Sequence, residues 1–185
     1  KAAQMIQRSL IQSDDMDLDG IDIAVKYIPL DAIGGDYYSI TPLTEGGTGV
    51  FIGDVTGHGV SAALYLSLLK ATTDRKCRKY ALEPGNYITS LNSELIGNMP
   101  MSFLTAIYGV FEKTIHGKTR FSFASAGHPH PVLWRAETST LEYINSKGTI
   151  LGIFNDLKYG ETDILLQKGD RVFLYTDGIP ETVNS

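Results

Sequence analysis

The chain has 185 residues, of which 43% are hydrophobic and 20% are charged. This length and composition predict one globular domain with its own core and exclude a disordered or fibrous protein. Lys and Arg number 16 against 21 Asp and Glu, so the net charge is -5, and no basic stripe indicates a nucleic-acid partner. The longest nearly apolar run, residues 60–69, is shorter than the roughly 20 residues that cross a bilayer. Direct membrane insertion of this domain is therefore not expected.

The hydrophobic pattern predicts strands and helices in alternating groups. Ala3, Ile6 and Leu10 share one face of an N-terminal helix, which an acidic connector separates from the first strand. Gly46-Gly47 marks a hairpin turn. The predicted helices cover residues 60–75 and 84–96, and the predicted strands cover residues 21–30, 36–43, 48–55, 104–113, 119–126, 131–135, 141–144, 163–166 and 171–175.

This order of elements predicts an α+β layered fold, because hairpin-joined strands stand on both sides of two central helices. Most connections are too short for a parallel crossover, so the sheet is predicted to be antiparallel. Only the connection through residues 57–103 is long, and it holds both helices. The chain shows no internal repeat and no interdomain linker.

The single cysteine, Cys77, excludes an internal disulfide framework and a Cys-rich zinc site. A lone thiol fits a reducing compartment, so a cytoplasmic location is predicted. Cations at residues 75–79 favour a lowered pKa for this thiol, but no partner His with Asn or Asp can be assigned to it. We therefore interpret Cys77 as a surface residue at the end of a helix.

Three aspartates, Asp36, Asp54 and Asp177, each lie beside glycine at the end of a predicted strand. Singly, Asp next to Gly is common turn chemistry. Counted back from Gly46-Gly47, however, Asp36 and Asp54 lie opposite each other at one end of a hairpin. Two carboxylates ~4 Å apart repel by roughly 4 kcal/mol at an effective dielectric of 20, so such a pair needs a proton or a cation. Because no cationic side chain is nearer in sequence than Lys26, oxygen ligands without His or Cys favour Mg²⁺ or Mn²⁺.

The segment 52–61 runs from a strand through a glycine-rich bend into a helix, which can aim backbone N–H groups at an anion. It lacks the Gly-Lys-Ser/Thr ending of a Walker-type loop. His58 in this bend is either a general acid or a loop residue that contacts backbone. His128 stands between glycine and proline, and we interpret it as part of a rigid turn rather than as a metal ligand.

Six sequence blocks, in this order, resemble the bacterial metal-dependent serine/threonine phosphatases of the PPM superfamily, in the SpoIIE/RsbU-like branch. The similarity runs along nearly the whole chain. The blocks are Ala3-Gln4-Met5-Ile6-Gln7-Arg8-Ser9-Leu10, Ile33-Gly34-Gly35-Asp36-Tyr37-Tyr38, residues 52–64, Phe103-Leu104-Thr105-Ala106, Ala126-Gly127-His128-Pro129 and Leu174-Tyr175-Thr176-Asp177-Gly178-Ile179-Pro180-Glu181.

The resemblance implies a β-sandwich flanked by helices and a two-metal hydrolytic site. Asp36, the Asp54 side chain, the Val55 carbonyl and Asp177 are expected to hold two Mn²⁺ or Mg²⁺ ions, and the three aspartates are the expected catalytic residues. A metal-activated water is expected to attack a phosphoserine or phosphothreonine in line. The implied substrate is a phosphorylated regulatory protein, an anti-sigma-factor antagonist, in stress-response signalling.

Two departures from the family pattern bear on domain organisation. Ser39 occupies a position where family members commonly carry another Asp, and the family closes with a helix and strand bearing an Asp-Asp pair. We therefore expect residues 1–13 to be a signalling helix and residues 14–185 to be a phosphatase domain lacking its final helix and strand. Such a fragment is expected to bind metal weakly and to have weak or no activity. An upstream sensor domain in the same chain and a homodimer through the N-terminal helix are the other implied partners.

Two alternatives remain open at this level. The first is a catalytically inactive, phosphatase-like scaffold in a signalling protein, which the absent fourth acid allows. The second is an anti-sigma-type ATP-binding kinase, because residues 54–59 resemble its Asp-x-Gly-x-Gly box. That fold needs a helical Asn before the box, whereas Asn86 and Asn92 follow it, so the sequence disfavours a kinase.

Overall fold

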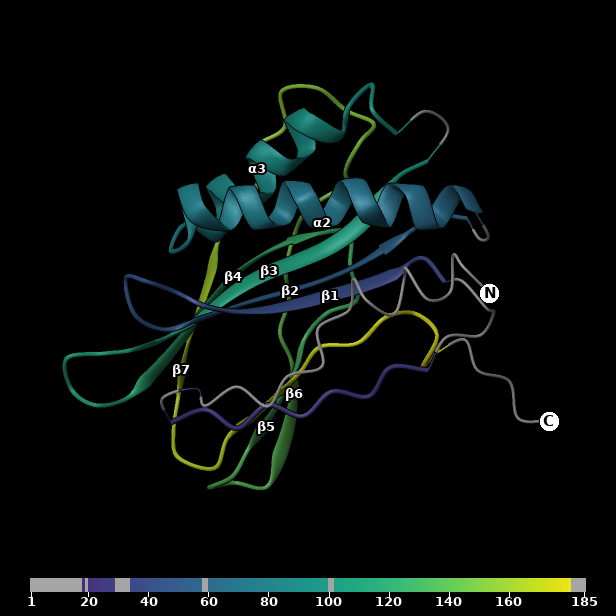
Figure 1. The fold of residues 1–185 in the computed structure, drawn as a ribbon. Coiled ribbons are helices and arrows are strands. Elements are labelled where there is room, and N and C mark those ends of the chain that lie inside the picture. The colour runs from purple at the N-terminus through teal and green to yellow at the C-terminus, as the bar shows by residue number, and fades with distance from the viewer. Residues whose placement is uncertain (1–17, 19, 29–33, 58–59, 100–101, 181–185) are drawn as a thin grey trace.

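The computed structural model describes residues 18, 20–28, 34–57, 60–99 and 102–180. Within these ranges the chain forms two antiparallel sheets (Figure 1). The first sheet consists, in spatial order, of β1 (Asp36–Pro42), β2 (Thr48–Val55), β3 (Leu104–Lys113), β4 (Thr119–Ala126) and β7 (Thr162–Leu166). The second consists of β6 (Thr140–Tyr143), β5 (Val132–Arg135) and β8 (Arg171–Phe173).

Two helices, α2 (Val60–Tyr80) and α3 (Pro84–Leu95), cover one face of the five-stranded sheet, and the three-stranded sheet lies on its other side (Figure 1). On the helix side, the Tyr87 ring of α3 stacks on the Tyr108 ring of β3 with 3.7 Å between ring centroids. Leu91 of α3 is fully buried in the same core. The predicted α+β class and the antiparallel sandwich with a helical layer are confirmed.

The second core fills the space between the two sheets. Its buried members come from both sheets: Ile107, Phe121, Phe123, Leu133 and Leu166. Because side chains alternate along a strand, the three central strands β2, β3 and β4 contribute to both cores. On β2, Phe51 joins the helix-side core and Ile52 joins the core between the sheets.

One predicted strand is absent. The alternation of Ile21, Ile23 and Val25 predicted a strand over residues 21–30, but the described residues 20–28 form no strand. Alternation supplies an apolar face only, whereas a strand also needs a neighbouring backbone for its hydrogen bonds. Ile23 and Val25 are in fact exposed.

The interpretation of Cys77 as a surface residue is wrong. Helix α2 continues to Tyr80 rather than ending near residue 75, so Cys77 follows Leu66, Leu69 and Thr73 at helical spacing on the buried side. Its Sγ atom lies 3.7 Å from the Tyr108 hydroxyl. Burial raises the pKa of the Cys77 thiol, against the lowering that the neighbouring cations predicted.

Two of the cationic side chains at residues 75–79 form ion pairs with α3. Arg75 pairs with Glu94 of α3, and the Lys76 Nζ atom lies 3.0 Å from a Glu94 carboxylate oxygen. These pairs connect the end of α2 to α3. No helix among the described residues has the length and apolar character needed to cross a membrane.

The predicted signalling helix, residues 1–13, lies outside the described residues, as do His58 and Gly59 of the glycine-rich bend.

Candidate functional site

Asp36 and Asp54 are direct partners in the β1–β2 ladder. Asp36 begins β1, Asp54 is the penultimate residue of β2, and the register between them agrees with the count back from Gly46-Gly47. Alternation places both on the face that carries Ile52, which is the face turned toward the second sheet. The pair therefore stands at one end of the large sheet, on its inter-sheet side.

The segment after β8 reaches this pair from the second sheet. Burial raises the pKa of the Asp36 carboxyl, a hydrogen bond with the Thr176 side chain lowers it, and the charge of Asp177 raises it again. Thr176 and Asp177 thus approach Asp36 although they are about 140 residues away in sequence. Two strands of one sheet and the end of the other sheet bring the three predicted acids to the same end of the sandwich.

The backbone at Val55 faces the same place. A Cβ atom added to Gly35 would clash with the Val55 carbonyl oxygen and would lie 2.7 Å from the Asp54 Oδ1 atom. These two oxygens therefore converge on the space beside the Gly35 Cα, which only glycine leaves open. The Val55 N–H also donates to the Gly35 carbonyl at 3.1 Å, which fixes the two segments side by side.

Thr56 anchors the chain where β2 ends. Its backbone N–H and its hydroxyl both donate to the Phe103 carbonyl, at 3.0 and 3.2 Å, and its hydroxyl accepts from the Phe103 N–H at 3.0 Å. Hydrogen bonds to Gly35 on one side and, through Thr56, to Phe103 on the other therefore fix the backbone of Asp54 and Val55. The Asp54 and Val55 oxygens consequently have little freedom to change direction.

Tyr27 lies near the acidic pair. Its ring centroid is 6.4 Å from that of Tyr38 on β1. Burial raises the pKa of Tyr27 to about 12, and the charges of Asp36, the Tyr38 phenol and Asp54 contribute in the same direction. A neutral phenol beside two carboxylates adds a polar, aromatic wall to the site.

His128 lies beside Thr105 of β3 and is only 4% exposed. Its Nδ1 atom is 2.9 Å from the hydroxyl oxygen of Thr105, and Thr105 is the β3 partner of Asp54 in the ladder. Burial lowers the pKa of His128 to about 4, while an interaction with the Tyr175 backbone opposes this change. The ring is thus neutral at neutral pH, and its burial fits the predicted structural role better than a ligand role.

No group of three or more His, Cys, Asp or Glu side chains in the described ranges is arranged to hold a metal ion. Asp36 and Asp54 are paired by the strand register, and the charge of Asp177 acts on Asp36. The three side chains nevertheless do not form a group arranged to hold a metal ion. Their role as metal ligands stays a prediction.

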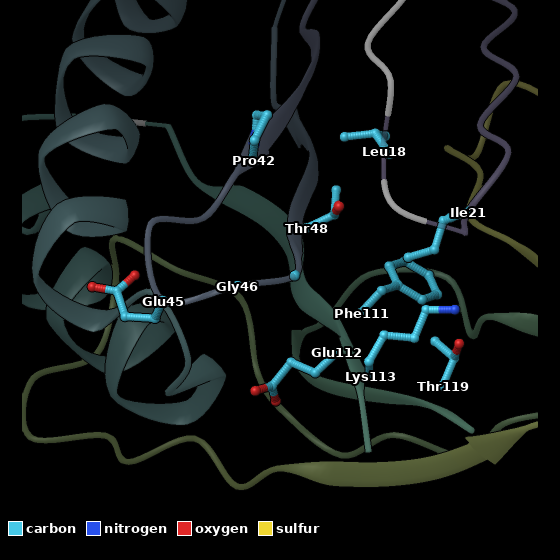
Figure 2. A pocket seen from close by; sticks show the side chains of 11 residues that line it. Leu18, Ile21, Pro42, Glu45, Gly46, Thr48, Phe111, Glu112, Lys113 and Thr119 are labelled. Atoms are coloured by element: carbon cyan, nitrogen blue, oxygen red, sulfur yellow. The ribbon is translucent and has the colours of Figure 1, made fainter. Parts of the chain in front are cut away.

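A separate pocket of about 360 Å³ lies at the other end of the β1–β2 hairpin (Figure 2). Pro42, Gly46, Gly47 and Thr48 line it together with Phe111. Six residues of strand separate Pro42 from Asp36, which at about 3.3 Å per residue is about 20 Å. This pocket is therefore distinct from the acidic end of the sheet.

The arrangement of the two sheets and the helical layer is that of the PP2C phosphatase domains. The SiaA-PP2C domain of Pseudomonas aeruginosa matches with a TM-score of 0.76 at 21% identity, over 96% of this chain and 69% of that one. At this level of identity the similarity defines the fold alone.

The chain belongs to the SpoIIE family: the family model described as Stage II sporulation protein E matches residues 44–185. Phosphoserine phosphatase RsbU of Bacillus subtilis (strain 168) is 30% identical over 97% of this chain and 52% of its own length. Phosphoserine phosphatase RsbP of the same organism is 28% identical over 90% of this chain and 41% of its own length. The chain thus spans about half the length of these curated relatives or less.

The structure adds three residues to the surroundings of the acids that sequence reasoning did not single out: Tyr27, Thr105 and Thr176. Thr105 and Thr176 lie inside two of the sequence blocks that carried the family resemblance, so the sequence marked both residues but did not indicate what their side chains do. Tyr27 lies in the segment predicted to be a strand, and no motif marks it.

Proposed function

We propose that this chain is the phosphatase domain of a metal-dependent protein serine/threonine phosphatase. The observation that carries the proposal is the pairing of Asp36 with Asp54 across β1 and β2, with the charge of Asp177 beside Asp36. The PP2C fold and the family relatives named phosphoserine phosphatases support the same activity.

The donor atoms at this end of the sheet fit a hard divalent cation. Asp36, Asp54, Asp177 and the Val55 carbonyl would hold two Mn²⁺ or Mg²⁺ ions, since they supply only oxygen. The convergence of the Val55 oxygen and the Asp54 Oδ1 atom beside Gly35 supports this fit. When bound, such ions supply a water of low pKa and neutralise charge on the transferring phosphoryl group.

The chain's own residues prepare the site for this chemistry. Partial burial and the charge of Asp177 raise the pKa of Asp36, so its charged form is disfavoured until a cation binds beside it. Thr56 and Gly35 hold the Asp54–Val55 step in place. The charges of Asp36 and Asp54 act on the Tyr27 phenol, so this side chain is close enough to the acids to affect their surroundings.

The proposed substrate is a phosphoserine or phosphothreonine on a regulatory protein, an anti-sigma-factor antagonist. The names of the curated relatives support a phosphoserine substrate, and the choice of an anti-sigma-factor antagonist is supported by the family resemblance. An upstream sensor domain, and a homodimer through residues 1–13, are proposed on the resemblance alone. In this scheme the domain acts in the cytoplasm.

One observation favours a second candidate, a catalytically inactive scaffold of the same fold. Among the described residues, no three acidic or other ligand side chains are grouped to hold a metal. A scaffold needs only the fold, whereas a phosphatase needs the acids to close around cations.

Hydrolysis of p-nitrophenyl phosphate and of a phosphoserine peptide by the full-length protein during a Mn²⁺ titration separates the two candidates. Wild type is expected to show Mn²⁺-dependent hydrolysis, and Asp54→Asn is expected to reduce it by roughly 100-fold or more, since even the loss of a residue that only supports a ligand costs 10- to 100-fold. Asp156→Asn makes the same chemical change at an exposed turn whose φ of 59° suits asparagine, and it is expected to leave hydrolysis unchanged. Absence of hydrolysis in wild type at any Mn²⁺ concentration would support the scaffold.

A further inference from the structure

His128 is buried in the turn that follows β4 of the large sheet. Gly127, with a φ of +65°, directly follows β4. Its N–H donates to the Gly148 carbonyl at 2.9 Å, and Ile150 leaves no room for a side chain there. This fixed backbone directs His128 into the interior, where its Nδ1 atom meets the Thr105 hydroxyl at 2.9 Å. Thr105 is in turn the ladder partner of Asp54.

The same imidazole interacts with the segment that carries the third acid. The Tyr175 backbone acts on the His128 ring, and the next residue, Thr176, is hydrogen-bonded to Asp36. Residues 174–176 belong to no strand, so no ladder fixes them to either sheet. Among the described residues, His128 and Asp36 both connect this irregular segment to the large sheet near Asp54.

We propose that His128 is a positioning residue: it holds the Tyr175–Asp177 segment at a set distance from Thr105 and Asp54, and so controls the affinity of the acidic site for a divalent cation. This inference rests on the proposed function, because it assumes that Asp177 and Asp54 bind the same cation cluster. It gives the buried histidine a role in that site without making it a ligand.

The chemistry of a neutral imidazole suits this role. A neutral ring has one donor and one acceptor. If Nδ1 accepts the proton of the Thr105 hydroxyl, Nε2 carries the ring hydrogen, yet Nε2 is buried without a hydrogen-bond partner of standard geometry among the described residues. A buried donor left unpaired is costly. A full hydrogen bond from Nε2 to the Tyr175 backbone would satisfy it and fasten the Asp177 segment.

Two substitutions separate the two ring nitrogens. Asn places an amide near the Nδ1 position, so His128→Asn keeps a group for Thr105 and loses the group that faces Tyr175. Gln places its amide near the Nε2 position, so His128→Gln keeps a donor for Tyr175. If His128 only fills space, both variants have the same effect on cation binding; if it positions the segment, they differ.

Isothermal titration of the purified full-length protein with Mn²⁺ alone tests the inference without relying on hydrolysis. His128→Asn is expected to weaken Mn²⁺ binding by about 10- to 100-fold, the usual cost of losing a group that supports a metal ligand. His128→Gln is expected to recover most of the affinity. Asn92→Ala serves as the matched control: Asn92 is buried and bonds the 152–154 loop through Gly152 N–H and the Phe154 carbonyl, and it belongs to α3, on the face of the large sheet opposite to the acids. Its loss should lower the melting temperature and leave Mn²⁺ affinity unchanged.

The outcomes distinguish this inference from the proposed function. If wild type binds Mn²⁺ with an affinity that Asp54→Asn abolishes, and both His128 variants bind as wild type does, the positioning role is refuted and the phosphatase site stands. If wild type does not bind Mn²⁺, the metal site itself is refuted. Should His128→Asn fail to fold, Thr105→Val, which keeps the side-chain shape and removes the hydroxyl, is expected to weaken binding in the same direction; unchanged affinity in this variant would overturn the inference.

Discussion

Lowering the pH from 7 to 4 should destabilise the protein through His128. Burial lowers the pKa of this side chain from 6.5 to about 4. The unfolded chain therefore takes up a proton below pH 6.5, whereas the folded chain stays neutral at this ring until about pH 4. Because the unfolded state binds more protons in this window, stability is complete above pH 6.5 and is lost as the pH falls.

The expected loss follows from the two pKa values. Each pH unit between 6.5 and about 4 costs about 1.4 kcal/mol, so His128 alone removes about 3 kcal/mol of unfolding free energy by pH 4. This is a large part of the stability of a typical domain. The raised pKa of Asp36 has the opposite sign, since a group that holds its proton more tightly in the folded state loses its contribution as the pH rises.

Urea unfolding at a series of pH values, for wild type and for His128→Gln, isolates this effect. The contributions of Asp36 and of every other titrating group are common to both proteins and cancel in the difference. The unfolding free energy of wild type is expected to fall by about 3 kcal/mol relative to the variant between pH 7 and pH 4. Parallel curves for the two proteins would refute the burial of a neutral His128.

Three further predictions test the packing around the site and the core. Gly35→Ala is expected to reduce Mn²⁺ affinity at least tenfold in calorimetry and to destabilise the fold by about 1–3 kcal/mol, because its Cβ would clash with the Val55 oxygen; Gly160→Ala, with nothing within 4 Å, should be silent, and equal effects would contradict the close approach. Cys77, buried and with a raised pKa, should react with a thiol reagent such as dithionitrobenzoate only after urea unfolding, so rapid reaction of the native protein would be inconsistent with its place in the core. Leu91→Ala, at a side chain with no exposure, should cost about 2–5 kcal/mol in urea unfolding, and a loss below 1 kcal/mol would argue against this packing of α3.

Much of the fold could be predicted from the sequence because the strands are bounded by turn residues. The predicted bounds of β2, β3 and β4 agree with the structure residue for residue. Gly46 and Gly47, both with φ above +90°, close the hairpin that sets the register of Asp36 against Asp54. Once a turn fixes the register, alternation decides which side chains share a face.

What could not be predicted depends on contacts between distant segments. The residues 20–28 have the alternation of a strand and lack a partner strand, which no local pattern reveals. Cys77 is buried because α2 continues for another turn under tertiary contact with β3, which overrides the polar local sequence. Likewise, the approach of Thr176 and Tyr27 to the acids depends on how the two sheets pack, so the sequence blocks indicate the acids and not their surroundings.

The central claim is that Asp36, Asp54 and Asp177 bind divalent cations together at one end of the sandwich. Anomalous diffraction at the manganese edge, from crystals of the protein soaked in Mn²⁺, tests it most directly. The account predicts anomalous peaks within about 2.5 Å of carboxylate oxygens from β1, β2 and the segment after β8. No peak at these carboxylates, in crystals whose acids point away from one another, would contradict it.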